Sequence, residues 1–455
     1  MKQHFQPISA FKKEPYKKIL CFPKVKETEV EKRLKELKKL GITHVSFSGP
    51  LQIEKCRILG KGYVGMVVLA KNSSSVCALK IRRTDSPRKN MTNEAKLLKA
   101  ANKLDIGPKF VKNSKNFLIM EYIEGEKIID WAQKPETKSQ EIRSVLNNVL
   151  RECYLLDDAG LDHGELSTID KHVIVSKNRN TIIDFESSSL DRKPSNVTGA
   201  SQAILIGTGL AKIIQKKIKL PPKKTIIDLI RKYKKNPTLE NFEKITIDLK
   251  LQNPGRFEEQ VSLLRSDKKL QPLIRRIGPC SMRITKNPFQ TLVEAIIYQQ
   301  LSEASASAIT KRFLKLYGKF PTPKQVFNTT DKKLKDIGIS GTKINYIKGL
   351  AKLVVKKEID FRKISKLSDE QVIEELTKIK GIGNWTAQIY LMFCLQRTDI
   401  LPVGDLGIQK GIRDMFSLKE LPNPKTLEKY AARWKPNRSI ACWYIWKSQR
   451  INSIG

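Results

Sequence analysis

Hydrophobic residues follow two different spacings along this chain. Residues 27–40 carry apolar side chains at helical spacing and are followed by Gly41, which predicts an amphipathic helix with a left-handed end. Two further stretches with the same periodicity predict helices over 92–104 and 139–159. Short runs with alternating or β-branched residues predict strands at 53–58, 66–70, 77–81 and 117–122.

The spacing changes character near residue 253. Before it, apolar runs at 173–175 and 181–184 flank a polar turn and predict a hairpin, and residues 221–251 form a lysine-rich helical stretch. After Asn253-Pro254-Gly255, strand signals stop and amphipathic helices follow one another. We therefore predict a multidomain protein with an α+β domain over 1–252 and an all-α domain over 253–455.

Charge narrows the choice of partner. The chain has 86 Lys+Arg against 46 Asp+Glu, a formal net charge of +40, and 40% of its residues are hydrophobic. Such an excess attracts polyanions, so nucleic acid is the first partner to consider, ahead of a role in solubility. Hydrophobic content of this size supports packed cores and argues against global disorder.

The cysteines and the hydropathy of the chain indicate the cellular compartment of the protein. The seven cysteines are scattered singly and no C-x-x-C pair occurs, so zinc and iron–sulfur sites lack their usual ligand spacing. Isolated cysteines fit a reducing compartment. The first residues contain no apolar stretch of the signal-peptide kind, and apolar residues nowhere run for 18 positions. We expect a cytoplasmic monomer without membrane contact.

A helical hairpin with a glycine turn stands in the second half. Ser368 and Gln371 form a capping-box start, an apolar stripe follows, and the helix is expected to stop before Gly381. A second apolar helix opens after Gly383. Free N–H groups at such a helix start suit a phosphate oxygen, although an ordinary helix–helix turn would look alike.

An acid follows this hairpin. Leu401-Pro402-Val403-Gly404 is an extended loop that ends in Asp405, directly before another helix. A carboxylate held there can orient water and offset positive charge that develops on a sugar as a base leaves. Alternatively, Asp405 only caps the helix.

Several segments together resemble the helix-hairpin-helix–GPD superfamily of DNA glycosylases, and within it the 3-methyladenine DNA glycosylase II branch. The resemblance covers roughly 257–450. Its motifs occur in the correct order, as Asn287-Pro288-Phe289, Tyr298-Gln299-Gln300-Leu301-Ser302, Gly338-Ile339-Ser340-Gly341-Thr342-Lys343, Gly381-Ile382-Gly383-Asn384-Trp385-Thr386-Ala387 and Val403-Gly404-Asp405-Leu406-Gly407.

The resemblance assigns roles in base excision. It implies that Asp405 is the catalytic carboxylate. Lyase-competent relatives carry a lysine where this chain has Trp385, which implies base removal without strand cleavage. The resemblance also implies that Trp385 and Trp446 line the base pocket, unless they are core residues. Where bacterial members have a pocket tyrosine, this chain has Ile389, with Tyr390 beside it.

Further roles follow from the same resemblance. Leu301, with Gln300 beside it, matches the wedge that fills the gap left by an extruded nucleotide, and core packing is the alternative for Leu301. Gly381 and Gly383 match the phosphate-binding turn. Lys343 and Arg438 are candidate phosphate contacts, with a solvated surface role as the alternative. No cofactor and no iron–sulfur cluster is implied for this half.

The first half carries kinase-like motifs. Gly60, Gly62 and Gly65 form a G-x-G-x-x-G turn between strand-like runs, where backbone can close over phosphates. Lys80 ends a later strand, where it can reach the α- and β-phosphates, and Glu94 on the next helix is its natural ion-pair partner.

Two loops complete this set, and their compact spacing resembles the small RIO-type atypical protein kinases over roughly 20–249. His163-Gly164-Glu165 matches the catalytic loop, with Glu165 in place of the usual aspartate, and Asp170 replaces a metal-binding asparagine. Ile183-Asp184-Phe185-Glu186 matches the metal-binding loop, with Glu186 in place of glycine. The resemblance implies ATP and Mg²⁺ as ligands, with Asp170 and Asp184 on the metal.

These resemblances predict a monofunctional glycosylase that removes alkylated purines from duplex DNA by base flipping, fused to a kinase-like ATP-binding domain. The alternative is an atypical serine/threonine protein kinase that a non-catalytic helical module targets to DNA. The expected partners are damaged double-stranded DNA and ATP, and a protein substrate of the kinase-like domain is left open. A third reading makes this domain an ATP-responsive scaffold.

Overall fold

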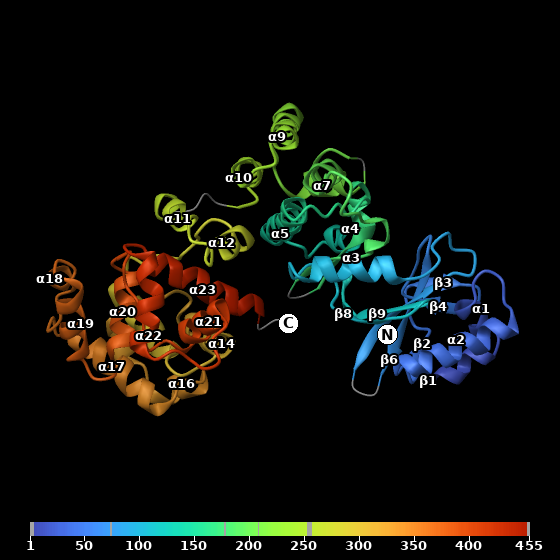
Figure 1. Cartoon of the computed structure of the whole chain (residues 1–455). Helices are drawn as coiled ribbons and strands as arrows, with labels where there is room; N and C mark the ends of the chain where they lie inside the picture. Colours follow the sequence, from blue (N-terminus) through green and yellow to red (C-terminus); the bar gives the residue numbers. More distant parts are fainter. Residues whose placement is uncertain (1–3, 73–74, 177–178, 208, 253–256, 453–455) are drawn as a thin grey trace. The chain divides into compact units, whose positions relative to one another are not determined.

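The computed structural model describes residues 4–72, 75–176, 179–207, 209–252 and 257–452. The chain forms two compact units, Met1–Gln252 and Asn253–Gly455 (Figure 1). In the described parts of the chain, every strand belongs to the first unit, and the second is built from helices. The predicted fold class, an α+β unit followed by an all-α unit, is confirmed.

The first unit begins with an antiparallel sheet. Its order is β1-β2-β6-β7-β9-β8, and β5 pairs with β6. The strands are β1 (Phe5–Pro7), β2 (His44–Ser46), β5 (Gly60–Lys61), β6 (Gly65–Lys71), β7 (Val76–Arg82), β8 (Phe110–Asn113) and β9 (Phe117–Glu121). Alternate residues of β6 and β7, such as Met66 and Leu79, are buried in one core with η1 (Ile8–Lys12), α1 (Tyr16–Leu20) and α2 (Glu27–Leu40). Gly41 ends α2 at φ 82° as predicted.

The predicted strand over 53–58 is wrong in one respect. The chain reverses there, so that β3 (Leu51–Ile53) and β4 (Cys56–Ile58) form a two-stranded hairpin. Glu54 takes φ 50° at the reversal, and a non-glycine residue in that left-handed region carries no sequence signal as strong as glycine. The hydrophobic pattern alone therefore could not show the turn.

A mostly helical part completes the first unit. Its core joins α3 (Thr92–Asn102) to α5 (Ser139–Asp158) and α7 (Asn196–Leu205), and a small sheet of order β10-β11-β12 lies alongside. The other elements are β10 (Glu126–Lys127), α4 (Ile128–Gln133), η2 (Leu166–Thr168), α6 (Ile169–His172), β11 (Val173–Val175), β12 (Asn180–Ile182), η3 (Phe185–Ser187), α8 (Leu210–Lys217), α9 (Lys223–Lys235) and α10 (Leu239–Asp248).

Within the described residues, no single helix is both long and apolar enough to cross a membrane. Helices α7 and α8 reach the length and apolar composition of a membrane span only when they are taken together, and they are bent by 64° at their break.

The second unit packs its helices around one large apolar core. Helix α19 (Asp369–Thr377) starts with the predicted capping box at Ser368, and α20 (Asn384–Phe393) follows the glycine turn. The remaining helices are α11 (Glu258–Leu264), α12 (Gln271–Ile277), α13 (Pro288–Tyr298), α14 (Glu303–Tyr317), α15 (Pro323–Asn328), α16 (Asp331–Asp336), α17 (Gly341–Val355), α18 (Phe361–Ile364), α21 (Leu406–Phe416), α22 (Pro424–Ala431), η4 (Ala432–Trp434) and α23 (Arg438–Asn452).

Candidate functional site

Asp405 stands at the start of α21, at the end of the loop that follows α20. Its Oδ1 accepts a hydrogen bond of 2.9 Å from the backbone N–H of Ile408, so the side chain caps the helix. The carboxylate is nevertheless only partly buried. The capping and catalytic roles are therefore compatible, because the cap uses one oxygen and leaves the group accessible.

Two indole rings hold the same carboxylate. Trp385 Nε1 donates to Asp405 Oδ2 at 2.8 Å, and Trp446 Nε1 donates to Oδ1 at 2.8 Å. Both rings are partly buried, and Trp446 lies against Phe393 with ring centroids 6.0 Å apart. The family resemblance implied that both tryptophans line the base pocket. Their hydrogen bonds to the acid are an additional role that spacing along the chain does not reveal.

Gly407 makes room for this arrangement. A Cβ atom at this position would lie 3.0 Å from Asp405 Oδ1 and 3.1 Å from Trp446 Cδ1. Contacts this short would force the acid or the ring to move by a few tenths of an ångström. The glycine is therefore part of the geometry that brings α23 against the start of α21.

The glycine turn between α19 and α20 is closely packed. Gly381 has φ 93°, and a Cβ there would lie 2.1 Å from Cγ of Tyr346, so only glycine fits. Gln299 Nε2 donates to Gly381 O and to Thr386 Oγ1, each at 2.9 Å, and so joins the end of α13 to the turn. Gly383 is exposed at the N-terminus of α20, where a phosphate oxygen can approach the free N–H groups.

The segment after α13 contains Gln300 and Leu301, the two residues predicted to form the wedge. Gln300 has φ 54°, and Leu301 is 39% exposed, which is high for a leucine and excludes the core-packing alternative. A pocket of about 230 Å³ beside them is lined by residues that include Ile309 and Ser340. This pocket adjoins the wedge, and Asp405 is not among its lining residues.

The amine of Lys343, predicted as a phosphate contact, is bound within the protein. Its Nζ donates to the carbonyl oxygens of Ile297 and Gln299, at 2.8 and 2.7 Å, and burial lowers its pKa. The ammonium thus satisfies carbonyl groups at the end of α13, which have no partner inside the helix. Lys343 therefore holds the end of α13, directly before Gln300 and Leu301.

Tyr390 lies elsewhere than the predicted base pocket, and Arg438, a candidate phosphate contact, forms an ion pair. Tyr390 is fully buried in the helical core near Phe361, and burial raises its pKa. Its ring points into the core and not toward the solvent-accessible face of α20. No contact of Tyr390 with Asp405 occurs among the described residues. Arg438 is paired with Asp399 through Nε at 2.6 Å and Nη2 at 2.9 Å.

In the first unit, Lys80 on β7 is surrounded by three carboxylates. Its Nζ lies 2.8 Å from Glu94 Oε1, 2.7 Å from Asp184 Oδ1 and 2.7 Å from Glu186 Oε2. Burial alone would lower the pKa of Lys80, but the three negative charges outweigh it and raise the pKa well above the usual value. The predicted pair of Lys80 with Glu94 is present, and Glu186 is an addition.

The glycine-rich turn lies between β5 and β6. Gly62 N–H donates to Gly65 O at 2.8 Å, which closes the turn. A Cβ on Gly65 would lie 3.0 Å from Cγ of Lys80, so this glycine lets the turn approach the lysine stem. Tyr63, at the tip, is 73% exposed.

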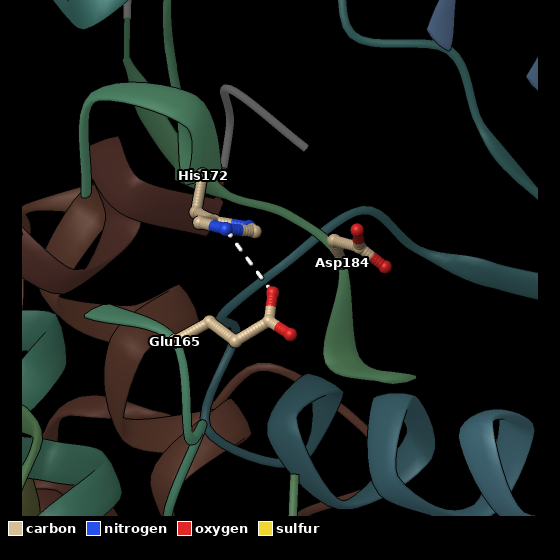
Figure 2. Close-up of side chains that lie close together, drawn as sticks. All are labelled: Glu165, His172 and Asp184. Carbon is tan, nitrogen blue, oxygen red and sulfur yellow. Dashed lines mark ion pairs between the residues drawn. The ribbon is translucent and has the colours of Figure 1, made fainter. Parts of the chain in front are cut away.

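Glu165 is held by two side chains, one of which the sequence did not single out. Ser187 Oγ donates to its Oε1 at 2.6 Å, and His172 Nε2 lies 3.2 Å from its Oε2 (Figure 2). His172 is buried at the end of α6. His172 follows Glu165 by seven residues, across η2 and α6. No sequence motif marks this spacing, so the pair could not be recognised from the sequence.

Glu165, His172 and Asp184 also form a possible metal-ligand group, because one ligand atom of each lies within 4.8 Å of the others (Figure 2). Among the described residues, Asp170, predicted as a metal ligand, does not belong to this group. It lies in the first turn of α6 and is partly exposed. His172 Nδ1 is buried without a partner, so the ring lacks the second hydrogen bond that usually orients a metal-binding histidine.

The residues fit a nucleotide–metal complex in part. The buried Lys80–Glu94 pair and Asp184, which has φ 72° at the start of its loop, provide a cation for phosphates and a carboxylate for a metal. Burial raises the pKa of Asp184, but the charge and hydrogen bond of Lys80 outweigh burial and lower the pKa, which favours the ionised carboxylate. Glu186 does not fit such a complex, because it stands in place of a glycine and its carboxylate binds Lys80.

Comparison with known proteins places both units. The model of the "HhH-GPD superfamily base excision DNA repair protein" family matches residues 293–437, and that of the "RIO domain" matches residues 71–196. The alkylbase DNA glycosidase-like protein mag2 of Schizosaccharomyces pombe is 33% identical over 195 residues, which are 42% of this chain and 92% of the relative. DNA-3-methyladenine glycosylase 1 of the same yeast is 34% identical over 187 residues, which are 40% of this chain and 82% of the relative.

One solved structure is that of the Schizosaccharomyces pombe 3-methyladenine DNA glycosylase with abasic DNA. It is 32% identical, covers 42% of this chain and 97% of its own, and has a TM-score of 0.40. The assignment rests on the sequence relatives, most of whose length this chain spans. The chain therefore belongs to the helix-hairpin-helix–GPD superfamily of base excision DNA repair proteins, with 3-methyladenine DNA glycosylases as its relatives and a RIO domain in its first unit.

Proposed function

We propose that the second unit is a DNA glycosylase that hydrolyses the N-glycosidic bond of alkylated purines, of the 3-methyladenine and 7-methylguanine type, in duplex DNA. The single observation that carries this proposal is Asp405, partly exposed and held by two indole N–H groups at 2.8 Å. The similarity to DNA-3-methyladenine glycosylase 1 of Schizosaccharomyces pombe supports the same reaction.

In this mechanism the bond between the sugar C1′ and the base nitrogen breaks, and the electron pair leaves with the base. Positive charge develops on the sugar, and the Asp405 carboxylate stabilises it. A water oxygen then bonds to C1′, and its proton passes to Asp405 or to solvent. The N–H bonds from Trp385 and Trp446 fix the carboxylate, so little reorganisation is needed as the charge appears.

The same site limits the reaction to base removal. A lyase step needs an amine that attacks C1′, and Trp385 stands where lyase-competent members carry a lysine. Its indole nitrogen donates to Asp405 and has no lone pair to offer. The exposed Leu301 is suited to fill the space of the extruded nucleotide.

The test is release of 3-methyladenine and 7-methylguanine from alkylated duplex DNA. Asp405→Asn should lower release by about a hundred-fold or more, as loss of one electrostatic stabiliser does in other enzymes, while DNA binding persists. Asp414→Asn is the matched control, because Asp414 is exposed on the same helix. Release by Asp405→Asn at the rate of the unchanged protein would refute the proposal.

For the first unit we propose nucleotide binding with Mg²⁺, through Lys80, Glu94 and Asp184. Bound Mg²⁺ would neutralise charge on the phosphates. In this proposal Glu165 accepts the proton of a hydroxyl substrate, and its contacts with Ser187 and His172 support this role by fixing the carboxylate. Phosphotransfer to a protein is tested with labelled ATP, and Asp184→Asn should abolish it.

The alternative assigns only kinase chemistry to the chain and makes the second unit a DNA-targeting module. The observation behind it is the intact Lys80–Glu94 pair. Phosphorylation that depends on Asp184, in a protein that never frees a base, would favour this alternative.

A further inference from the structure

Lys80 has no hydrogen-bond donor left for a phosphate. An ammonium group carries three N–H donors, and here three carboxylates lie within 2.8 Å of Nζ. The lysine of a kinase-like site is expected to contact the α- and β-phosphates. One of the three carboxylates must therefore give way before a nucleotide can be held.

Glu186 is the carboxylate that prevents Lys80 from contacting a phosphate. Glu94 belongs to α3 and is the normal partner of the lysine, and Asp184 is the metal ligand. Glu186 has no counterpart in the kinase pattern, which has glycine at this position. Its side chain is 8% exposed, so it lies inside the site.

The glycine-rich turn covers the same carboxylate. A Cβ built on Gly62 would lie 3.5 Å from Glu186 Oε2 and 3.7 Å from Oε1. The carboxylate thus lies between the turn and the ammonium of Lys80, whose Nζ is 2.7 Å from Glu186 Oε2. Phosphate oxygens of a nucleotide would lie between these same two groups.

We propose that Glu186 is a carboxylate latch that occupies the phosphate position of the first unit and must leave Lys80 when a nucleotide binds. This inference rests on the proposed nucleotide-binding function and deepens it. The latch makes the unit selective for nucleotides that arrive with a divalent cation. Lys80, Glu94, Asp184 and Glu186 together carry one positive and three negative charges, and this net negative cluster repels a bare polyphosphate.

The experiment uses the full-length chain and measures the dissociation constant of ADP or ATP, with Mg²⁺ and with EDTA, by calorimetry and by thermal shift. Glu186→Gln keeps the shape of the side chain and removes its charge, and Glu186→Ala removes the group. Both variants should fold, because Lys80 keeps two carboxylates. Glu31→Gln, on the exposed face of α2, is the control for net charge.

Both Glu186 variants should bind the Mg²⁺–nucleotide about ten- to a hundred-fold more tightly, the usual size of a charge-assisted hydrogen bond, and Glu31→Gln should match the unchanged protein. Equal or weaker binding by both Glu186 variants would overturn the latch. If binding depends on Lys80, tested with Lys80→Ala, but not on Glu186, the nucleotide proposal survives alone. If no variant binds a nucleotide, both proposals are overturned.

Discussion

The two units hold their key carboxylates in opposite ways. Asp405 accepts hydrogen bonds from three neutral N–H groups, those of Ile408, Trp385 and Trp446. Asp184 is bound to a buried lysine that two other carboxylates share. Neutral donors fix the Asp405 carboxylate without cancelling its charge, so it is ready to meet a cationic transition state. The charge of Asp184 is already partly compensated, and this site must rearrange before it binds a ligand.

The largest effects expected from this comparison come from replacing each acid by its amide. Asp405→Asn should lower base release by about a hundred-fold or more and leave nucleotide binding unchanged. Asp184→Asn should abolish binding of the Mg²⁺–nucleotide and leave base release unchanged. Both readouts are measured on both variants. An effect of either variant on the other unit's readout would mean that the two sites are coupled and not independent.

Acid should affect the first unit selectively. Burial, with a smaller contribution from His172, lowers the pKa of His163 from 6.5 to about 4. The unfolded chain therefore binds the proton first, and stability present above pH 6.5 is lost as the pH falls toward 4, by up to about 3 kcal/mol. All four histidines of the chain precede residue 253.

Calorimetric unfolding at pH 5 and pH 7.5 measures this difference. The transition of the first unit should move to lower temperature at pH 5, and His163→Gln should reduce the shift. The prediction fails if the transition of the second unit moves just as far while that of the first unit does not respond to the substitution.

Removing one neutral donor should have an intermediate effect. Trp385→Phe keeps an aromatic face but loses the N–H bond to Asp405 Oδ2. Base release should fall by about ten- to a hundred-fold, the range for a hydrogen bond to a charged group, mainly through kcat. Trp443→Phe is the control, because Trp443 is buried in the core. If Trp385→Phe changes only KM, the ring contributes to binding of the damaged base, and its hydrogen bond to Asp405 does not contribute to catalysis.

The smallest effect is expected at the wedge. Leu301→Ala shortens an exposed side chain and should reduce base release by up to about ten-fold, because the side chain offsets only part of the few kcal/mol that unstacking costs. The loss should be smaller on a mismatched or single-stranded substrate, in which the base is already extruded more easily. An equal loss on paired and unpaired substrates would contradict the wedge role.

Local patterns allowed much of the fold to be predicted. Helix α2 was expected over 27–40 and spans Glu27–Leu40, since its apolar stripe and Gly41 are both local signals. Ser368 and Gln371 likewise form the predicted capping box. The hairpin of β3 and β4 was missed because it turns at Glu54, whose left-handed backbone has no glycine to mark it.

Contacts between distant segments explain what was missed in the sites. The motifs identified Asp405 and Lys80, but they could not show that Trp446, 41 residues beyond Asp405, donates to it. Glu186 was recognised only as a missing glycine, and its bond to Lys80 spans 106 residues. Lys343 was predicted as a phosphate contact or a solvated surface residue, and its hydrogen bonds to carbonyl groups at the end of α13 were not foreseen. Such pairings depend on tertiary packing, which spacing along the chain does not encode.

Gly407 has a consequence for how this unit can diversify. A methyl group there would press on both Asp405 and the ring of Trp446, so a larger residue at position 407 has to displace the acid or the indole by a few tenths of an ångström. A substitution at this position therefore changes the hydrogen-bonded contact between acid and indole, although residue 407 itself has no polar side chain. Variation in lesion preference that leaves this contact intact must arise at other positions that border the site.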